Sequence, residues 1–554
     1  MSHPLFDRHR ALLDQALNAI STRGYWTPFP ESPSPKVYGE SAPAAGKAAF
    51  DALLNKPFAG ASGASVGSVG GEMSPYGIAL GVTYPKVALD RLFADIAKAE
   101  AAWRKAGPET WVGVALEILS RINKRSFEIA HAVMHTTGQA FVMSFQAGGP
   151  HAQDRGLEAV AYAWEEMHRI PVKAHWEKPQ GKNEPIRMEK HYRIVPRGVG
   201  LVIGCNTFPT WNGYPGLFAS LATGNAVIVK PHPNAVLPLA ISVQIAREVI
   251  AESGFDPNIV TLVVHAAGDD TAQKLALRPE VKLIDFTGSS ANGEWLERNA
   301  HQAQVYAEKA GVNQIIIDSV DDLKGVARNI AFSLALYTGQ MCTAPQNIYV
   351  PRDGIETAEG HVSFDQVAAA IAESVQKLVG DPARAIEILG AVVNDGVAER
   401  IDQARKLGPI VLDSQTIAHP DFPHARIRTP LIVRLDAKEE SKYLREWFGP
   451  VAFVVATRDT TESLDIARRA IVGHGALTLS LYTKNDEVLE RTIEVAETAG
   501  VALSINLTGG IFVNQSAAFS DFHGTGANPA ANAALTDSAF VASRFRVVQH
   551  RMHV

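Results

Sequence analysis

The chain has 554 residues, of which 20% are charged and 46% hydrophobic, an ordinary composition for a soluble globular protein. Its 52 Lys and Arg against 58 Asp and Glu give a formal net charge of −6, which argues against a nucleic-acid-binding protein because such a protein needs a basic surface. No apolar run reaches the ~20 residues that cross a bilayer, and the N-terminus lacks the apolar core of a signal peptide. Two cysteines are too few for a disulfide framework or a cysteine-rich metal site, so we expect a cytoplasmic protein without nucleic-acid, membrane or metal partners.

Residues 1–85 are predicted to form an N-terminal extension. Apolar residues at helical spacing between Leu5 and Ile20 predict a helix. The stretch 24–43 is rich in Pro and Ser and should be extended or irregular, and the Gly- and Ser-rich stretch 60–71 should be a surface loop. The second stretch has no Lys-Ser/Thr ending, so it is not a phosphate-binding P-loop. Amphipathic helices are expected next, over 87–106, 110–123 and 126–136.

Residues 172–195 alternate polar and apolar side chains around a Gly/Asn/Pro turn, which predicts a β-hairpin. The hairpin has little hydrophobic face of its own, and isolated hairpins are marginally stable in water. We therefore expect it to lean on another domain or subunit.

From Val199 onward, short apolar runs alternate with helical segments. This alternation predicts βαβ units around a buried parallel sheet, which binds ligands at the carboxyl ends of its strands. A second alternating set runs from about Asn313 to Thr483 and predicts a second α/β domain. The fold class is therefore α/β.

Several residues at strand ends could carry chemistry, although each also has a structural interpretation. Cys342, between Gly339 and Pro345, is either a buried structural thiol or a nucleophile on a tight loop. Asn206 follows a strand and is either a turn residue or an oxyanion donor. Glu308 is either a surface acid paired with its neighbour or a general base, and Glu446, Gly288 and Ser289 are equally ambiguous.

Taken in order, these segments resemble the aldehyde dehydrogenase superfamily from about Val87 to the C-terminus. The motifs are Asn before Phe-Pro, a strand ending in Lys-Pro, Phe-Thr-Gly-Ser, a strand ending in Glu, Gly-Gln-x-Cys and Glu-x-Phe-Gly-Pro. The opening segment resembles the PaaN branch of this superfamily, which is linked to phenylacetic acid degradation. The resemblance implies a Rossmann-type cofactor domain over 86–171 and 196–308, a catalytic domain over 309–522, and an oligomerisation element from 172–195 and 543–554.

The resemblance also implies roles for the matching residues. Cys342 would be the nucleophile, Asn206 an oxyanion donor together with the Cys342 backbone N–H, and Glu308 the base that activates water. The resemblance assigns cofactor contacts to Lys230 and Glu446 at the riboses, Gly288 and Ser289 at the pyrophosphate, and Phe448 near the nicotinamide. The Cys342 thiol, at the mouth of a positive cofactor site, would have a lowered pKa.

The implied activity is NAD(P)-dependent oxidation of an aldehyde, possibly linked to coenzyme A and derived from aromatic degradation. Two alternatives are a coenzyme A-acylating dehydrogenase and a non-catalytic scaffold. Relatives that prefer NAD commonly have an acid three residues after the Lys of the second strand, where this chain has Pro233. Lys230 could attract a phosphate and His232 could add a donor, so we expect NADP to be preferred or at least accepted, with NAD possible. In the family, elements such as the hairpin pair across subunits, so a homodimer or a dimer of dimers is expected.

Overall fold

The computed structural model describes residues 3–63 and 65–554. The first 85 residues form a helical layer and a small antiparallel ladder that pack on the rest of the chain. Their elements are α1 (Pro4–Thr22), α2 (Pro35–Tyr38), α3 (Ala42–Leu53), β1 (Gly67–Gly70) and β2 (Thr83–Lys86). The prediction that 60–71 is a loop is wrong at its end, because Gly67–Gly70 pairs with β2 and gains ladder hydrogen bonds; Ala64 of this stretch lies outside the described residues.

Five helices follow the extension; the first three confirm the predicted amphipathic segments, and the last two were not predicted. They are α4 (Leu89–Ala106), α5 (Pro108–Lys124), α6 (Ser126–Thr137), α7 (Phe141–Gly148) and α8 (Pro150–His168). The predicted first helix is confirmed as α1, and its contacts with α5 and α8 tie the extension to this layer.

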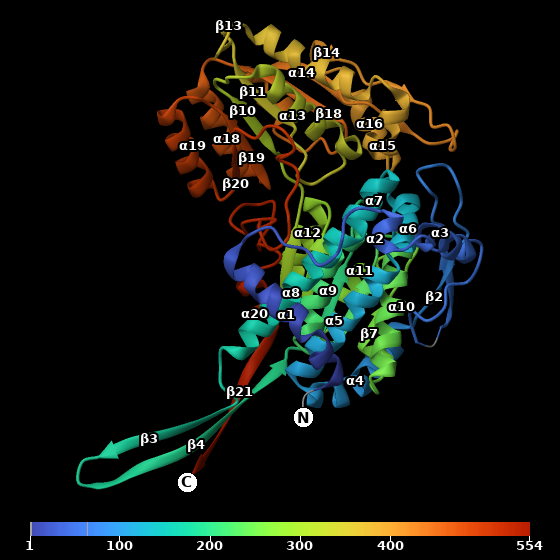
Figure 1. Cartoon of the computed structure of the whole chain (residues 1–554), viewed down its shortest axis with the longest axis vertical. Coiled ribbons are helices and arrows are strands. Elements are labelled where there is room, and N and C mark those ends of the chain that lie inside the picture. The colour runs from blue at the N-terminus through green and yellow to red at the C-terminus, as the bar shows by residue number, and fades with distance from the viewer. Residues whose placement is uncertain (1–2, 64) are drawn as a thin grey trace.

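A five-stranded parallel sheet with the order β7-β6-β5-β8-β9 forms the centre of the lower part of the molecule (Figure 1). Its strands are apolar and buried along most of their length, as predicted, because helices cover both faces. The strands are β5 (Val199–Ile203), β6 (Val227–Lys230), β7 (Val260–Leu262), β8 (Val281–Thr287) and β9 (Gln304–Glu308), and the helices are α9 (Pro209–Ala222), α10 (Leu237–Glu252), α11 (Thr271–Ala276) and α12 (Ser290–Asn299).

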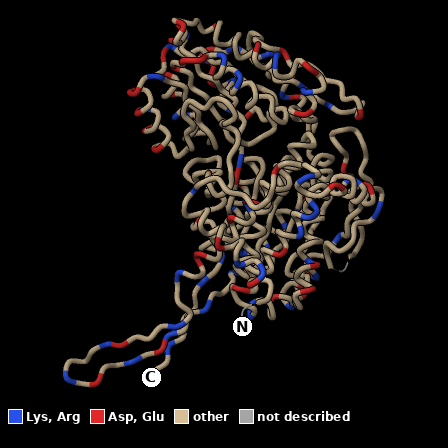
Figure 2. The backbone as a smooth tube through the Cα atoms, viewed as in Figure 1, with Lys and Arg blue, Asp and Glu red and all other residues tan. Residues whose placement is uncertain are grey.

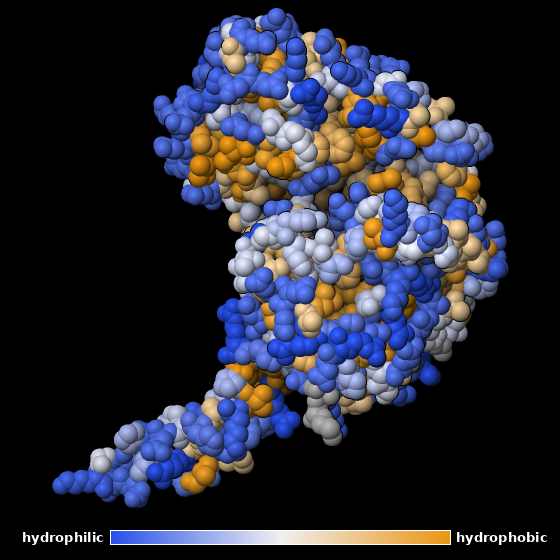
Figure 3. Space-filling view, in the orientation of Figure 1, coloured by the Kyte–Doolittle hydropathy of each residue, from blue (hydrophilic) through white to orange (hydrophobic). Residues whose placement is uncertain are grey.

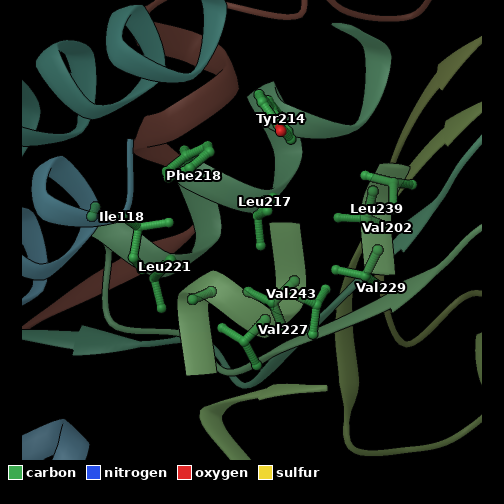
Figure 4. Close-up of a cluster of buried hydrophobic side chains, with 14 of the residues drawn as sticks. Ile118, Val202, Tyr214, Leu217, Phe218, Leu221, Val227, Val229, Leu239 and Val243 are labelled. Atoms are coloured by element: carbon green, nitrogen blue, oxygen red, sulfur yellow. The ribbon is translucent and has the colours of Figure 1, made fainter. Parts of the chain in front are cut away.

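The core of this region lies between the sheet and its helices. Figure 4 shows Val202, Val227 and Val229 of the sheet beside Leu217 of α9 and Val243 of α10. All five are buried, and each such side chain stabilises the fold by about 1.5–3 kcal/mol. The packing fixes the ends of β5 and α9, between which Asn206 lies.

A seven-stranded sheet, ordered β14-β17-β18-β11-β10-β19-β20, forms the upper part and confirms the second α/β unit (Figure 1). Neighbouring strands are parallel except for β14, which is antiparallel to β17. Its strands are β10 (Gln314–Ile317), β11 (Asn347–Pro351), β14 (Ile410–Leu412), β17 (Leu431–Asp436), β18 (Val451–Thr457), β19 (Thr478–Tyr482) and β20 (Ala502–Ile505). The helices of this part are α13 (Leu323–Ala335), α14 (Phe364–Val379), α15 (Pro382–Leu389), α16 (Asp395–Ala404), α17 (Glu440–Tyr443), α18 (Thr460–His474) and α19 (Asp486–Ala499). Two small antiparallel pairs are also present: β12 (Ile355–Thr357) with β13 (Gly360–Val362), and β15 (Thr416–Ile417) with β16 (Ile427–Arg428).

The predicted hairpin projects away from both sheets as an arm (Figure 1). The arm is a three-stranded antiparallel sheet of β3 (Lys173–Gln180), β4 (Asn183–Pro196) and the C-terminal β21 (Phe545–His553), which follows α20 (Ser538–Ala542). Figure 2 shows charged residues along its length. At its base Arg544, which has no exposed surface, makes a two-pronged ion pair with Asp285 of β8. None of the described helices is long and apolar enough to cross a membrane.

Candidate active site

The loop that carries Cys342 has a strained backbone. Tyr337, Thr338 and Gly339 all have positive φ values, of 51°, 55° and 63°, and positive φ is unusual for the first two. Hydrogen bonds from the Tyr337 hydroxyl to the Thr137 carbonyl and from the Thr338 hydroxyl to the Leu389 carbonyl hold the turn. A Cβ at Gly339 would lie 2.5 Å from the Gly449 carbonyl oxygen, so this position favours glycine. The tight loop predicted around Cys342 is therefore present.

Cys342, Glu308 and His523 converge at the end of β9. The His523 Nε2 atom lies 3.8 Å from Cys342 Sγ and 3.1 Å from Glu308 Oε1. The other carboxylate oxygen of Glu308 accepts a hydrogen bond of 2.8 Å from Asn212 Nδ2 on α9. Glu308 is buried, and Asn212 holds its carboxylate facing the thiol and the imidazole. This is a nucleophile beside two groups that can accept protons.

The electrostatics separate the roles of the thiol and the carboxylate. Burial raises the pKa of Cys342 well above its usual value, and the negative charge of Glu308 is the next largest cause of this rise. The expected lowering of the Cys342 pKa is therefore wrong: the thiol is enclosed beside a carboxylate and gains too little from nearby positive charge. Burial by itself would raise the pKa of Glu308, but His523, the Cys342 hydrogen bond and Arg155 together lower it. Glu308 is thus held as a carboxylate, as a base requires.

A buried arginine supports this site from the side of α8. Arg155 donates to the Trp211 carbonyl at 2.9 Å, and its guanidinium lies 3.7 Å from the centre of the Trp211 ring. Trp211 in turn packs edge-on against His523 with ring centres 4.6 Å apart. The stack fixes the imidazole and places a positive charge near Glu308.

Asn206 and Cys205 lie on the loop between β5 and α9. The Asn206 side-chain nitrogen approaches the Thr136 carbonyl oxygen at 3.4 Å, and its Oδ1 is buried without a hydrogen-bond partner among the described residues. Cys205 belongs to the same buried cluster as Tyr337 and Met341, so this loop packs against the Cys342 loop. Burial raises the pKa of Cys205 to about 11, which makes it an inert thiol.

A cavity of about 750 Å³ opens onto Cys342 and His523. Figure 3 shows hydrophobic side chains in the hollow between the upper and lower parts of the molecule. The cavity's aromatic lining residues are Tyr25, Trp26, Phe29, Phe208, Trp211, Phe332 and Phe512. Neither Lys nor Arg occurs among the described residues that line it. Such a cavity is suited to an apolar ligand whose reactive group reaches the thiol.

Five of the predicted cofactor residues, Lys230, His232, Pro233, Gly288 and Ser289, follow the carboxyl ends of β6 and β8, whereas Glu446 and Phe448 lie between α17 and β18; none of the seven lines this cavity. Lys230 ends β6, and burial lowers its pKa to about 8. Burial, then Lys230 and His265, lower the pKa of His232 to about 4. His265 follows β7 and is a third basic group near Lys230 that the sequence interpretation missed. Pro233 belongs to the same turn after β6. Burial and the charge of Lys230 lower the pKa of His265, and nearby Asp269 acts in the opposite direction.

Gly288 and Ser289 lie between β8 and α12, as predicted. Ser289 is the N-cap of the ten-residue helix α12, and its side chain makes no capping hydrogen bond. The helix N-terminus can therefore receive an anion such as pyrophosphate. Burial raises the pKa of Glu446 to about 7, although a hydrogen bond with the Gly311 backbone and the charge of Arg400 act in the opposite direction. Phe448 packs on the apolar cluster around Val393.

Comparison with known proteins agrees with this geometry. The model of the aldehyde dehydrogenase family matches residues 84–527. The chain belongs to the aldehyde dehydrogenase family. It is 67% identical to an NAD-dependent aldehyde dehydrogenase from Burkholderia multivorans of known structure, with a TM-score of 0.99 over 100% of both chains.

This aldehyde dehydrogenase is also similar, at lower identity, to two other named dehydrogenases. It is 24% identical over 419 residues to the 1-pyrroline-5-carboxylate dehydrogenase of Bacillus subtilis (strain 168), covering 74% of this chain and 76% of that protein. It is 26% identical over 418 residues to the lactaldehyde dehydrogenase of Escherichia coli (strain K12), covering 72% and 80% respectively.

Four residues of the site were missed from the sequence: Asn212, His523, Arg155 and Trp211. Trp211 and Asn212 lie on α9, five and six residues beyond Asn206, so their closeness to that motif along the chain was a usable signal. Arg155 looked like an ordinary helix residue. His523 lies in an irregular segment far along the chain from Cys342, and no local pattern marks it.

Proposed function

We propose that the enzyme oxidises an aldehyde to a carboxylic acid through a thioester on Cys342. The observation that supports this proposal is the convergence of three side chains: the Cys342 sulfur, a carboxylate oxygen of Glu308 and a ring nitrogen of His523 lie within 4.8 Å of one another. Each group has a separate task in the two halves of the reaction. We assign residues 86–171 and 196–308 to dinucleotide binding and 309–522 to catalysis, and a cytoplasmic location remains a prediction.

In the first half, Cys342 loses its proton to His523 and its sulfur attacks the aldehyde carbon to give a thiohemiacetal. Asn206 and the Cys342 backbone N–H serve as donors to the developing oxyanion. A nicotinamide dinucleotide held by Lys230, Glu446 and the N-terminus of α12 would supply the acceptor for the hydride that this carbon loses on conversion to the thioester.

In the second half, Glu308 takes a proton from water and the hydroxide attacks the thioester carbon. The carbon–sulfur bond then breaks, and the carboxylic acid and the free Cys342 result. Asn212 keeps the carboxylate oriented during this step. The balance is one aldehyde, one water and one oxidised dinucleotide converted to one carboxylate, one reduced dinucleotide and two protons.

The retained water base favours hydrolysis over transfer to coenzyme A. Acylating relatives commonly lack the Glu at this position, whereas Glu308 is present and oriented here. The test supplies aldehyde and dinucleotide without coenzyme A and measures reduced dinucleotide over many turnovers. Turnover that requires coenzyme A would instead identify an acylating enzyme, and no turnover with an intact thiol would indicate a scaffold.

For the substrate, we propose an aldehyde derived from aromatic degradation, as in phenylacetate catabolism. The resemblance of the opening segment to the PaaN branch and the aromatic lining of the cavity support this class. A panel of aromatic aldehydes, ring-cleavage semialdehydes and their coenzyme A thioesters would rank the candidates by kcat/KM. A preference for short hydrophilic aldehydes would contradict the assignment.

For the cofactor, we propose that the enzyme accepts NADP as well as the NAD used by its Burkholderia relative. Pro233 supplies no carboxylate to repel a 2′-phosphate, and Lys230 can offer it a positive charge. The pKa values of His232 and His265 are lowered, so these imidazoles are neutral near pH 7 and can contribute only ring N–H donors. Steady-state kinetics with both dinucleotides test this directly. Pro233→Glu should raise the KM for NADP far more than that for NAD by like-charge repulsion, and a wild-type enzyme inactive with NADP would refute the proposal.

For the assembly, we propose a homodimer or a dimer of dimers built through the arm. Most arm residues are exposed, including apolar Val172, Ile186, Val548 and Met552. Strand β20 is an open edge of the seven-stranded sheet and exposes Ile505. Unpaired edges and exposed apolar side chains favour pairing with another chain, so a partner's arm fits this edge.

A further inference from the structure

A short segment of the N-terminal extension forms part of the wall of the catalytic cavity. Tyr25, Trp26, Thr27, Phe29 and Glu31 line the same cavity as Cys342. This segment lies outside the range 84–527 that the family model matches. Figure 1 shows it as the dark-blue stretch that crosses the molecule between α1 and α2. The sequence interpretation assigned the extension no chemical role.

Specific contacts fix this wall in place. The Thr27 hydroxyl donates to Asp154 of α8 at 2.9 Å, and Glu31 pairs with His151 of the same helix at 2.8 Å. The Trp26 ring stands edge-on to Phe519, with ring centres 5.0 Å apart. The segment is therefore tied to α8 on one side and to the chain just before His523 on the other.

Tyr25 is placed differently from its neighbours. Its side chain is 75% exposed, although Tyr25 lines the cavity. Phe29, by contrast, is buried. An aromatic residue left exposed at a cavity gains burial when an apolar ligand covers it, and a tyrosine loses little conformational entropy in doing so.

The polar groups of the cavity limit the charge of the ligand. No described lining residue is a Lys or Arg that could pair with a carboxylate, and the two lining histidines, His151 and His523, are already paired with Glu31 and Glu308. The buried carboxyl of Asp154 accepts the Thr27 hydrogen bond, and burial raises its pKa well above the usual value. A free carboxylate on a ligand would lose its hydration without gaining a cation. Asp154 and Glu31 are engaged with Thr27 and His151, so these two carboxyl groups offer little to a cationic ligand.

We propose that residues 25–31 are a specificity wall that selects uncharged aldehydes with a bulky apolar body and disfavours aldehydes bearing a free carboxylate. The aromatic side chains of Tyr25 and Trp26 cover the apolar body while the aldehyde carbon reaches Cys342. The proposal rests on the proposed aldehyde oxidation and narrows its substrate class.

The experiment compares kcat/KM for phenylacetaldehyde, propanal and succinic semialdehyde in the wild type and in Tyr25→Ala and Trp26→Ala. The wild type should favour phenylacetaldehyde, and each variant should lose about 10-fold in kcat/KM for it, with propanal nearly unchanged. Val37→Ala is the matched control, because Val37 is also an exposed apolar residue of the extension but does not line the cavity.

Equal losses for phenylacetaldehyde and propanal would show that the wall is merely structural and would overturn the proposal, as would unchanged kinetics in both variants. A wild type that favours succinic semialdehyde would also overturn it. Calorimetric binding of phenylacetaldehyde to Cys342→Ala, with and without Tyr25→Ala, keeps the test independent of turnover. If no aldehyde is oxidised but Tyr25→Ala still weakens this binding, the proposed function is wrong and the proposed role of residues 25–31 in binding is still supported.

Discussion

Glu308→Gln should separate the two halves of the reaction. Gln has the size of Glu, and Asn212 can still donate to its carbonyl oxygen, so the fold and the cavity should be retained. The substitution removes the water base, and general-base catalysis contributes about 10²–10⁴-fold. We therefore expect steady-state turnover to fall by that factor while one equivalent of reduced dinucleotide per subunit still appears in a rapid burst.

The same substitution should also change the thiol. Glu308 is, after burial, the largest cause of the raised pKa of Cys342, so a neutral Gln lowers that pKa and populates the thiolate at lower pH. Rapid-mixing absorbance measures the burst, and the rate of alkylation by iodoacetamide across pH measures the thiolate. Loss of the burst together with turnover would show that Glu308 acts before hydride transfer. Slower alkylation of the variant would refute the electrostatic argument.

Three further outcomes are expected. His523→Asn removes the group that contributes most to lowering the pKa of Glu308, and leaves Asn212, Cys342 and Arg155 around the carboxylate. The pKa of Glu308 should therefore rise and move the acidic limb of the kcat–pH profile to higher pH. An unmoved limb would contradict the pairing of His523 with Glu308. Cys342→Ala should abolish oxidation but keep dinucleotide binding, measured by calorimetry, whereas Cys205→Ala should be mild because its thiol is buried and inert. Deleting residues 546–554 should give monomers or aggregates in light scattering while sparing the Arg544–Asp285 ion pair, and a stable active dimer without them would refute the assembly.

The fold could be predicted where side-chain periodicity has one interpretation. The mainly apolar runs at β5, β6 and β8 indicate strands covered on both faces, and the structure has them in one parallel sheet. The alternation in 172–195 indicated the arm hairpin, whose pairing with β21 depends on contacts between chain ends that no local pattern records. The strand Gly67–Gly70 was missed because its Gly and Ser residues carry no strand preference, and only its partner β2 stabilises it.

The candidate site was predictable only in part, for a similar reason. Cys342 and Glu308 occur in motifs that resemble those of the aldehyde dehydrogenase superfamily, and the structure brings both together. The pKa of Cys342 could not be predicted, because it depends on burial and on the carboxylate that the fold places beside it. His523 had no motif, and its importance follows only from two distances, to Sγ and to Oε1.

The position of His523 also connects the chemistry to substrate choice. The segment that ends at His523 contains Phe519, which packs against Trp26 of the N-terminal wall, while Trp211 packs against His523 itself. Any substrate that displaces the wall therefore acts on the elements that hold the imidazole beside the thiol. Such coupling predicts that, with a bulky substrate that contacts the wall such as phenylacetaldehyde, the loss at Trp26 affects kcat as well as KM, whereas the loss at the exposed Tyr25 affects mainly KM. The N-terminal extension thus belongs to the active site in a physical sense, although it lies outside the part of the chain that defines the family.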